Sequence, residues 1–290
     1  MKSSAGRLAV AQSADSKVAI QSLQQIESLD LPELKPYRTM RLEHEHLANR
    51  IFVAEGEKVV RRLLESTLEV LSVVLPNRWL DQFIPLIESR PEQIRVFTAD
   101  KKVLERLTGF TMYQGLMAAA RMPEPLPLEV AHHRSPRPRL WVAIDGLANS
   151  ENVGAVVRNC TAFNVQALVV GETSASPFLR RAVRSSMGMV LRLQVVETHC
   201  LSAALRQLAK MGVRCIAAHP HASGTTLARA DLSGDCCIVF GSEGQGLGET
   251  TLAACGEHVA IPMPAHVDSL NVASAVAVFL FEANRQRGFV

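Results

Sequence analysis

The sequence predicts an α/β protein with two domains, and three observations support this prediction. The chain of 290 residues is long enough for two domains of about 100–200 residues each. Short apolar segments rich in Val and Ile alternate with segments of helical periodicity along most of its length. Apolar residues make up 48% and charged residues 20% of the chain, which excludes a largely disordered protein.

The first 36 residues have weak hydrophobic periodicity and end in a proline-flanked segment. We therefore expect residues 1–36 to form a flexible N-terminal arm. A short helix at residues 20–29 is the alternative for that part of the arm. Over residues 37–122 the periodicity strengthens and predicts a small α/β domain. Its expected strands are 51–54, 70–75, 94–97 and 116–120, and its expected helices are 57–64, 78–87 and 101–107.

Five prolines interrupt the chain after this domain, at positions 123, 125, 127, 136 and 138. Because proline fixes φ and removes a backbone donor, residues 123–138 are expected to form a semi-rigid, partly extended linker. A second α/β domain is predicted at 139–290, and its strands are apolar on both faces, which is typical of a parallel sheet covered by helices. Its expected strands are 140–144, 167–170, 191–196, 214–218, 236–240 and 258–261, and its expected helices are 152–163, 178–186, 201–211 and 270–287.

The sequence does not indicate a membrane or secreted protein. The longest apolar run lies within Val272–Phe281 and is far shorter than the ~18 residues of a spanning helix. The first residues contain no secretory apolar core, so a soluble, cytoplasmic protein is expected. The net charge of +3 permits an acidic partner without requiring one.

No metal or disulfide is predicted. The six cysteines show no C-x-x-C spacing, which favours buried free thiols over a disulfide or a zinc site. They are Cys160, Cys200, Cys215, Cys236, Cys237 and Cys255. The segment His219-Pro220-His221 has no nearby acidic or thiol partner beyond Cys215, which favours a polar loop over a metal site.

Three segments of the second domain carry polar and glycine residues where strands end, which is where open α/β sheets bind ligands. The first runs from Asp145 to Arg158, and either Asn149 or Ser150 is suited to cap the helix that follows. Gly154 and Arg158 then share one helix face, where the arginine is placed to lie over an anionic group such as a nucleic-acid phosphate. A solvated surface arginine is the alternative.

The second segment is Gly241-Ser242-Glu243-Gly244-Gln245-Gly246-Leu247-Gly248, which follows an apolar strand. It matches neither a phosphate-binding loop nor a dinucleotide fingerprint nor an esterase elbow. Glu243 would repel phosphates and favours a ligand that is neutral or positive at this point. A tight turn alone explains one or two of these glycines, but not all four.

The third segment begins Ile261-Pro262-Met263 and continues through Ser269-Leu270-Asn271-Val272. Ser269 is expected to cap the last helix. Asn271 is a poor helix former, so we interpret it as a hydrogen-bonding device in the first turn.

Together, these segments resemble the three motifs of the SpoU family of RNA ribose methyltransferases, within the SPOUT class. The first resembles N-x-G-x-x-x-R, the second G-x-E-G-x-G-L, and the third I-P-M followed by S-L-N-V. The resemblance covers about residues 140–282. Residues 52–60 and 113–116 resemble, more weakly, the small N-terminal RNA-binding domain, similar to some ribosomal proteins, that many members carry.

The resemblance implies a deep trefoil knot in the C-terminal domain, a homodimer with its active site near the subunit interface, and S-adenosylmethionine as the methyl donor. By resemblance, the cofactor-binding residues are Gly241, Glu243, Gly246, Leu247, Ile261, Met263, Ser269, Leu270 and Asn271. The implied catalytic residues are Arg158 and Asn152, with Glu243 and Asn271 in support. Ala265, Ala273 and Asn164 depart from the family pattern; Asn164 is a mild change because asparagine tolerates left-handed backbone angles.

The expected substrate is structured RNA, and rRNA is favoured over tRNA because the N-terminal domain resembles that of rRNA enzymes. Candidate phosphate contacts are Arg134, Arg137, Arg180, Arg181 and Arg184, although ordinary solubility is an equal explanation. With two Trp and two Tyr, extensive base stacking is not indicated. A tRNA enzyme and a catalytically silent RNA-binding factor remain alternatives, whereas the failed glycine fingerprint disfavours a nucleotide-dependent oxidoreductase.

Overall fold

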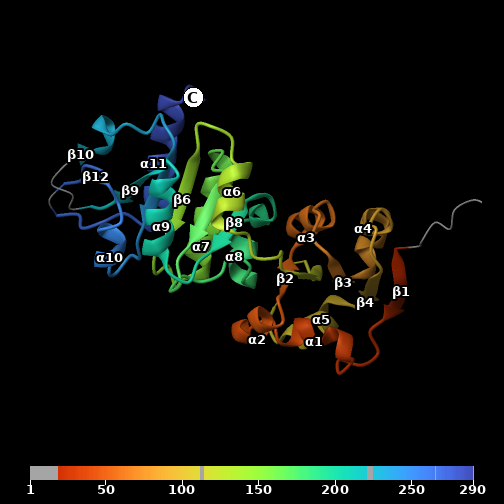
Figure 1. Ribbon diagram of the computed structural model, residues 1–290. Coiled ribbons are helices and arrows are strands. Elements are labelled where there is room, and N and C mark those ends of the chain that lie inside the picture. Colours follow the sequence, from red (N-terminus) through yellow and green to blue (C-terminus); the bar gives the residue numbers. More distant parts are fainter. Residues whose placement is uncertain (1–18, 112–113, 221–224, 265, 290) are drawn as a thin grey trace, which may run out of the picture.

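The computed structural model describes residues 19–111, 114–220, 225–264 and 266–289, which form two α/β domains with a sheet each (Figure 1). The first sheet contains β1 (Ile20–Gln25), β2 (Ile51–Glu55), β3 (Val70–Leu75), β4 (Ile94–Thr98) and β5 (Met117–Arg121). Its order is β1-β4-β3-β5-β2, with β1, β4 and β3 parallel and β5 antiparallel to both neighbours. Its helices are α1 (Lys35–Arg38), α2 (Glu43–Ala48), α3 (Glu57–Leu64), α4 (Leu80–Glu88) and α5 (Lys101–Thr108).

Alternating strand residues divide between the two faces of this sheet. Phe52 and Ala54 of β2 join a core with α3 and α4, whereas Val53 joins a second core with α1 and α5. The four strands and three helices predicted between residues 51 and 120 are confirmed, with small shifts at their ends.

Two predictions for the start of the chain are wrong. Residues 20–25 are neither a helix nor part of a flexible arm: they form the edge strand β1, which pairs with β4. The sequence signal is weak because most of this strand is exposed and its backbone pairing is long-range. Helices α1 and α2 were also missed. Tyr37 of α1 is fully buried, and its hydroxyl lies 2.8 Å from Ser72 Oγ. Residues 1–18 lie outside the described residues.

The predicted linker contains an additional helix, α6 (Leu128–Arg134). Leu128 and Ala131 are buried in the core of the second domain. This helix was not among the expected elements of the partly extended linker. Proline excludes a helix only where the missing donor or the ring would disturb it, and Pro127 precedes the first turn.

The second sheet is parallel, as the continuous apolar runs predict, but among the described residues it contains seven strands and not the six expected. They are β6 (Leu140–Ile144), β7 (Ala167–Val170), β8 (Gln194–Glu197), β9 (Arg214–Ala218), β10 (Thr225–Thr226), β11 (Cys236–Phe240) and β12 (Glu257–Ala260). Their order is β10-β12-β9-β11-β6-β7-β8. The next two strands in sequence, β7 and β8, therefore lie on one side of β6, and the later strands β9 to β12 lie on its other side. The order reverses between β6 and β11, and such a switch point is the usual ligand site of an open α/β sheet.

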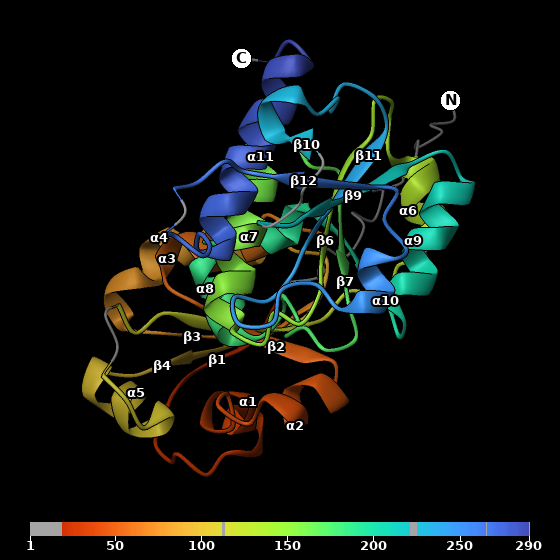
Figure 2. The ribbon, with the colours of Figure 1, turned by 90° about the vertical axis from the view of Figure 1, so that its left-hand side faces the viewer.

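Helices cover both faces of this sheet (Figure 2). They are α7 (Ser150–Ala162), α8 (Arg180–Ser185), α9 (Leu201–Lys210), α10 (Glu249–Leu252) and α11 (Val272–Gln286). Helices α7, α8 and α11 lie on one face, and α6, α9 and α10 lie on the other. Short 3-10 turns occur at Pro32–Leu34, Asn77–Trp79, Met189–Arg192 and Leu227–Arg229.

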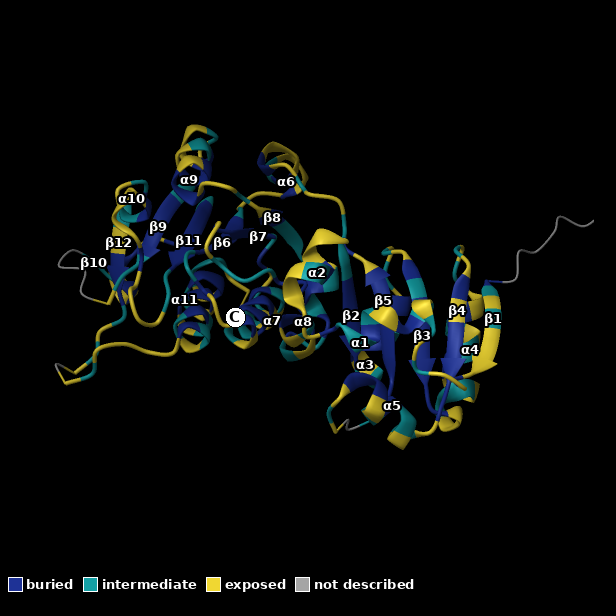
Figure 3. Ribbon diagram, turned by 90° about the horizontal axis from the view of Figure 1, so that it is seen from below, coloured by how far each residue is buried: buried dark blue, intermediate teal, exposed yellow. Residues whose placement is uncertain are grey.

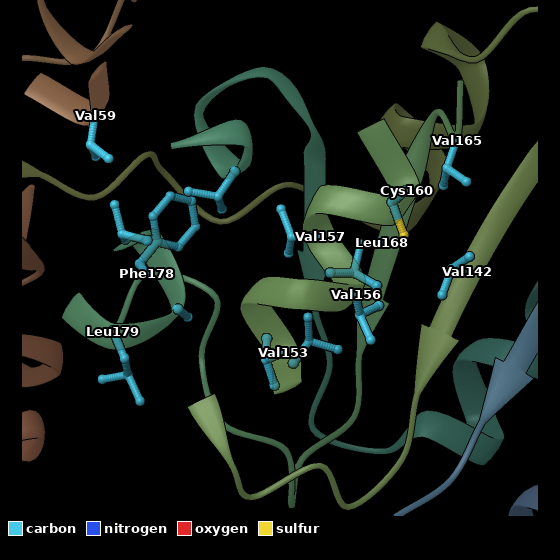
Figure 4. Close-up of a cluster of buried hydrophobic side chains, with 14 of the residues drawn as sticks. Val59, Val142, Val153, Val156, Val157, Cys160, Val165, Leu168, Phe178 and Leu179 are labelled. Atoms are coloured by element: carbon cyan, nitrogen blue, oxygen red, sulfur yellow. The ribbon is translucent and has the colours of Figure 1, made fainter. Parts of the chain in front are cut away.

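The two domains share one buried apolar core. Buried strands run through the middle of both domains (Figure 3), and Val59 of α3 points toward Phe178, just before α8 (Figure 4). The rings of Phe52 and Phe178 lie 5.8 Å apart. Across the described residues, no helix is both long and apolar enough to cross a membrane.

Candidate functional site

The three segments singled out in the sequence meet at one end of the second sheet. They follow β6, β11 and β12, whose carboxyl ends point the same way because the sheet is parallel. A cavity of ≈ 310 Å³ lies there. Of the expected cofactor-binding residues, all except Asn271 line it, namely Gly241, Glu243, Gly246, Leu247, Ile261, Met263, Ser269 and Leu270.

The sequence analysis missed part of this lining. Ala218 ends β9, the strand beside β11, and His219 and Pro220 follow it, whereas Phe279 comes from α11. The residues at the end of β9 could have been identified from the sequence, because all strands of a parallel sheet end at the same edge and ligands bind there. Phe279 is an apolar helix residue with no distinguishing pattern.

The glycine segment is a closed loop. Ser242 and Gly246 exchange two backbone hydrogen bonds of 3.0 Å each. A Cβ at Gly241 would lie 2.2 Å from the backbone C and O of Gly246, so this close approach excludes a side chain. Gly246 has φ of +68°, which favours glycine. The Gly248 N–H donates to Asp145 Oδ2 at 3.2 Å, which ties the loop to the end of β6.

One polar residue from each segment meets beside the cavity. Glu243 Oε1 accepts hydrogen bonds from Asn152 Nδ2 at 3.1 Å and from Asn271 Nδ2 at 2.6 Å. The two amides also lie within reach of each other, with Asn271 Nδ2 3.4 Å from Asn152 Oδ1. The structure thus brings together three of the four expected catalytic residues in a partly exposed cluster.

The helix caps correct one prediction. Asn271, not Ser269, caps α11: its Oδ1 accepts the Ala273 N–H at 3.0 Å, and the helix begins at Val272. The interpretation of Asn271 as a hydrogen-bonding device is confirmed, although it precedes the helix. At α7 the cap is Asn149, which accepts from the Glu151 N–H.

We expect Asn271→Ala to lower the free energy of unfolding by about 1 kcal/mol, because it removes a cap. Asn271→Ser keeps a capping oxygen and loses only the donor to Glu243, so its stability should stay close to that of the wild type. Urea unfolding of both variants checks this. Equal destabilisation of the two would contradict a capping role.

Arg158 lies on the exposed side of α7 and, among the described residues, has no hydrogen-bond or ion-pair partner. Its guanidinium is therefore accessible to a ligand. Gly154 has a different role from the one predicted. A Cβ there would lie 1.9 Å from Ser185 Oγ and 2.4 Å from the Ala182 carbonyl oxygen, so α8, not an anionic ligand, makes the close approach.

Gly154→Ala should therefore destabilise the protein by about 1–3 kcal/mol, because a methyl group would push α8 away from α7. The control is Gly256→Ala, where a Cβ would meet nothing within 4 Å. Urea unfolding of the pair measures the difference. If both substitutions were neutral, the helix contact would not need glycine.

The five expected RNA-binding arginines differ in their surroundings. Arg180 and Arg184 pair with Glu55 of the first domain at 2.6 and 3.2 Å. Arg137 pairs with Asp235 at 3.1 Å. Arg134 and Arg181 are exposed and, among the described residues, form no ion pair, whereas Arg137 and Arg184 are exposed but paired.

The cysteines are free thiols, and all are buried except Cys200, which is exposed. Burial raises the pKa of Cys215 and of Cys255 to about 12. Within the described ranges, no group of three or more His, Cys, Asp or Glu is arranged to hold a metal ion. His221 and Ala265 lie outside the described residues. Asn164 has φ of +58°, which confirms that asparagine suits this position.

Comparison with known proteins assigns these features to a family. The model of the SpoU rRNA Methylase family matches residues 139–281. An uncharacterized tRNA/rRNA methyltransferase of Mycobacterium tuberculosis is 33% identical over 243 residues, 81% of each chain. The 23S rRNA (guanosine-2'-O-)-methyltransferase RlmB of Vibrio vulnificus is 28% identical and is aligned over 80% of this chain and 96% of its own. An AdoMet-bound rRNA methyltransferase from Sinorhizobium meliloti has a similar fold, with a TM-score of 0.79, 24% identity, and coverage of 91% of this chain and 98% of its own.

Proposed function

Because this chain belongs to the SpoU rRNA methylase family, we propose that it transfers a methyl group from S-adenosylmethionine to a ribose 2′-hydroxyl in structured RNA. The observation that carries the proposal is the cluster of Asn152, Glu243 and Asn271. It joins the three sequence motifs beside a cavity at the carboxyl ends of β9, β11 and β12.

The cavity suits the methyl donor in size and charge. Its volume of ≈ 310 Å³ is within the ~300–1,000 Å³ range of small-molecule sites. Leu247, Ile261 and Leu270 provide an apolar lining, and the Glu243 carboxylate favours a positive group such as a sulfonium. When bound, the donor supplies an electrophilic methyl group. Glu243 is held by two amide donors, so its carboxylate is oriented before any ligand arrives.

Arg158 is proposed to orient a phosphate of the RNA and to stabilise the charge that develops on the ribose oxygen. A guanidinium in a protein keeps its protons, so this side chain acts as a hydrogen-bond donor and not as a base. The absence of an internal partner among the described residues leaves its donors available for the RNA. Holding the hydroxyl in line with the methyl group supplies much of the acceleration.

We propose rRNA as the substrate and tRNA as the alternative. The likeness to an enzyme named for 23S rRNA supports the first, whereas the mycobacterial relative is named for both RNAs. The first domain is proposed to bind RNA together with the exposed Arg134 and Arg181. Weaker binding at higher salt is the expected signature of such phosphate contacts.

The C-terminal domain is proposed to be knotted and to form a homodimer through α11. Four large apolar side chains near the end of the chain are exposed, namely Leu270, Val278, Phe281 and Phe289. Val278 and Phe281 are three residues apart and share one face of α11. Exposed apolar side chains on one helix face are a common feature of protein–protein interfaces.

We expect Phe281→Glu to convert the dimer into a monomer, because it places a charge in an apolar interface. Val130→Glu is the control, since Val130 is also exposed but lies on α6, on the other face of the sheet. Light scattering after size-exclusion chromatography gives the mass of each. A wild-type protein that is monomeric at all concentrations would contradict the proposed dimer.

The proposed activity is tested with purified protein, S-adenosylmethionine carrying a labelled methyl group, and unmodified rRNA or tRNA. We expect label in a 2′-O-methylated nucleoside after complete digestion of the rRNA. Label in a base would contradict ribose methylation. Binding of RNA without any transfer would favour the catalytically silent factor.

A further inference from the structure

A single carboxylate of the first domain holds two arginines of the second. Glu55, the last residue of β2, binds Arg180 through Oε2 at 2.6 Å and Arg184 through Oε1 at 3.2 Å. The Arg180 guanidinium also lies 5.0 Å from the centroid of the Phe110 ring. Arg180 therefore inserts between a carboxylate and an aromatic ring of the first domain.

The pair of Glu55 and Arg180 is largely removed from water. The side chains are 7% and 11% exposed, respectively. Separating such a pair would leave an uncompensated buried charge, so the pair resists any domain movement that breaks it. A cavity of ≈ 260 Å³ adjoins the pair and is lined by both domains, including Glu55 and Arg184. The cavity leaves this part of the interface open, so the ion pairs of Glu55 act together with apolar contacts such as that of Phe52 with Phe178 in fixing the angle between the domains.

Helix α8 connects this contact to the candidate site. It is pressed against α7 at Gly154, and Ser185 Oγ donates to the Glu151 carbonyl oxygen at 3.2 Å. Helix α7 carries Asn152 and Arg158. A displacement of the first domain relative to α8 would therefore change where bound RNA lies with respect to Arg158.

We propose that Glu55 is a positioning residue for the reaction, which locks the RNA-binding domain in the orientation that presents the target ribose to Arg158. This inference rests on the proposed function. It also assigns Arg180 and Arg184 mainly to the domain interface and not to direct phosphate contacts.

The test is Glu55→Gln, which is nearly isosteric and leaves every arginine in place. Glu69→Gln is the control, because Glu69 forms an exposed ion pair with Arg121 inside the first domain. Spin labels on Cys200, the exposed native cysteine, and on a cysteine introduced by Glu88→Cys report the distance between the domains without any need for activity. Turnover at saturating RNA, RNA affinity and donor affinity are measured in parallel.

We expect Glu55→Gln to broaden the distance distribution and to lower turnover roughly 10- to 100-fold, with donor affinity unchanged, because misplaced reactants lose most of the benefit of orientation. The control should change none of these. An unchanged distance distribution would overturn the proposal, whatever the activity. Tighter RNA binding with normal turnover would also overturn it, since the arginines would then be RNA contacts released from the carboxylate. If the wild-type protein had no methylation activity but Glu55→Gln still broadened the distance distribution, the role of Glu55 in fixing the domain orientation would be supported. Only the proposed function would then be contradicted.

Discussion

Replacement of Arg158 by alanine is expected to reduce the rate of RNA methylation at saturating substrates by roughly 10²–10³-fold, the usual loss when one donor to a developing oxyanion is removed. Affinity for the methyl donor should stay unchanged, because Arg158 does not line the cavity. Single-turnover kinetics and calorimetric titration of the donor measure the two effects separately.

Arg158→Lys separates the two possible roles of the arginine. A lysine keeps the positive charge but loses the planar set of donors, so we expect low turnover and an unchanged dependence of the rate on pH. Preserved turnover with a shifted basic limb would instead show that the residue at this position removes the proton. The next residue of the helix, Asn159, does not offer an alternative RNA contact, because its Nδ2 donates to the Ala273 carbonyl oxygen. Arg158 is therefore the accessible polar group of the two.

Gly241→Ala is expected to weaken binding of the methyl donor roughly 10- to 100-fold, which corresponds to the ~1–3 kcal/mol that overpacking costs. The added methyl would lie 2.2 Å from the backbone of Gly246, and neither backbone segment is able to move without opening the loop. The loop lines the cavity, so opening the loop should directly lower the affinity for the methyl donor.

Gly248→Ala provides the matched control at the end of the same loop. A Cβ at Gly248 would lie 3.7 Å from Asp145 Oδ2, an ordinary contact, its φ is −64°, and Gly248 does not line the cavity. Donor affinity should therefore remain that of the wild type. Equal losses in the two variants would mean that the loop depends on general flexibility and not on the close approach at Gly241.

The candidate site was largely predictable because its residues interrupt regular patterns. Polar and glycine residues at strand ends have no role in the core, so Glu243 and Asn271 are recognisable from the amino-acid sequence alone. The physical role of Gly154 was not predictable, since a glycine that admits a ligand and one that admits a helix look the same in sequence. The close approach of Ser185 and Ala182 appears only in three dimensions.

The fold was predicted best where apolar periodicity is strong. Strands β3, β6, β7, β9 and β11 begin and end at the expected residues. Edge strand β1 was missed, because its assignment depends on pairing with β4, which is distant in sequence. The pairing of Glu55 with Arg180 was missed for the same reason, as 125 residues separate the two.

The central claim, ribose methylation of rRNA at this site, is tested most directly by mapping 2′-O-methyl groups in the RNA of cells with and without the gene. The account predicts that one or a few rRNA positions lose the modification, and that the gene carrying Arg158→Ala does not restore it. An rRNA methylation pattern that is identical in the two strains, or a loss confined to tRNA, would contradict the account.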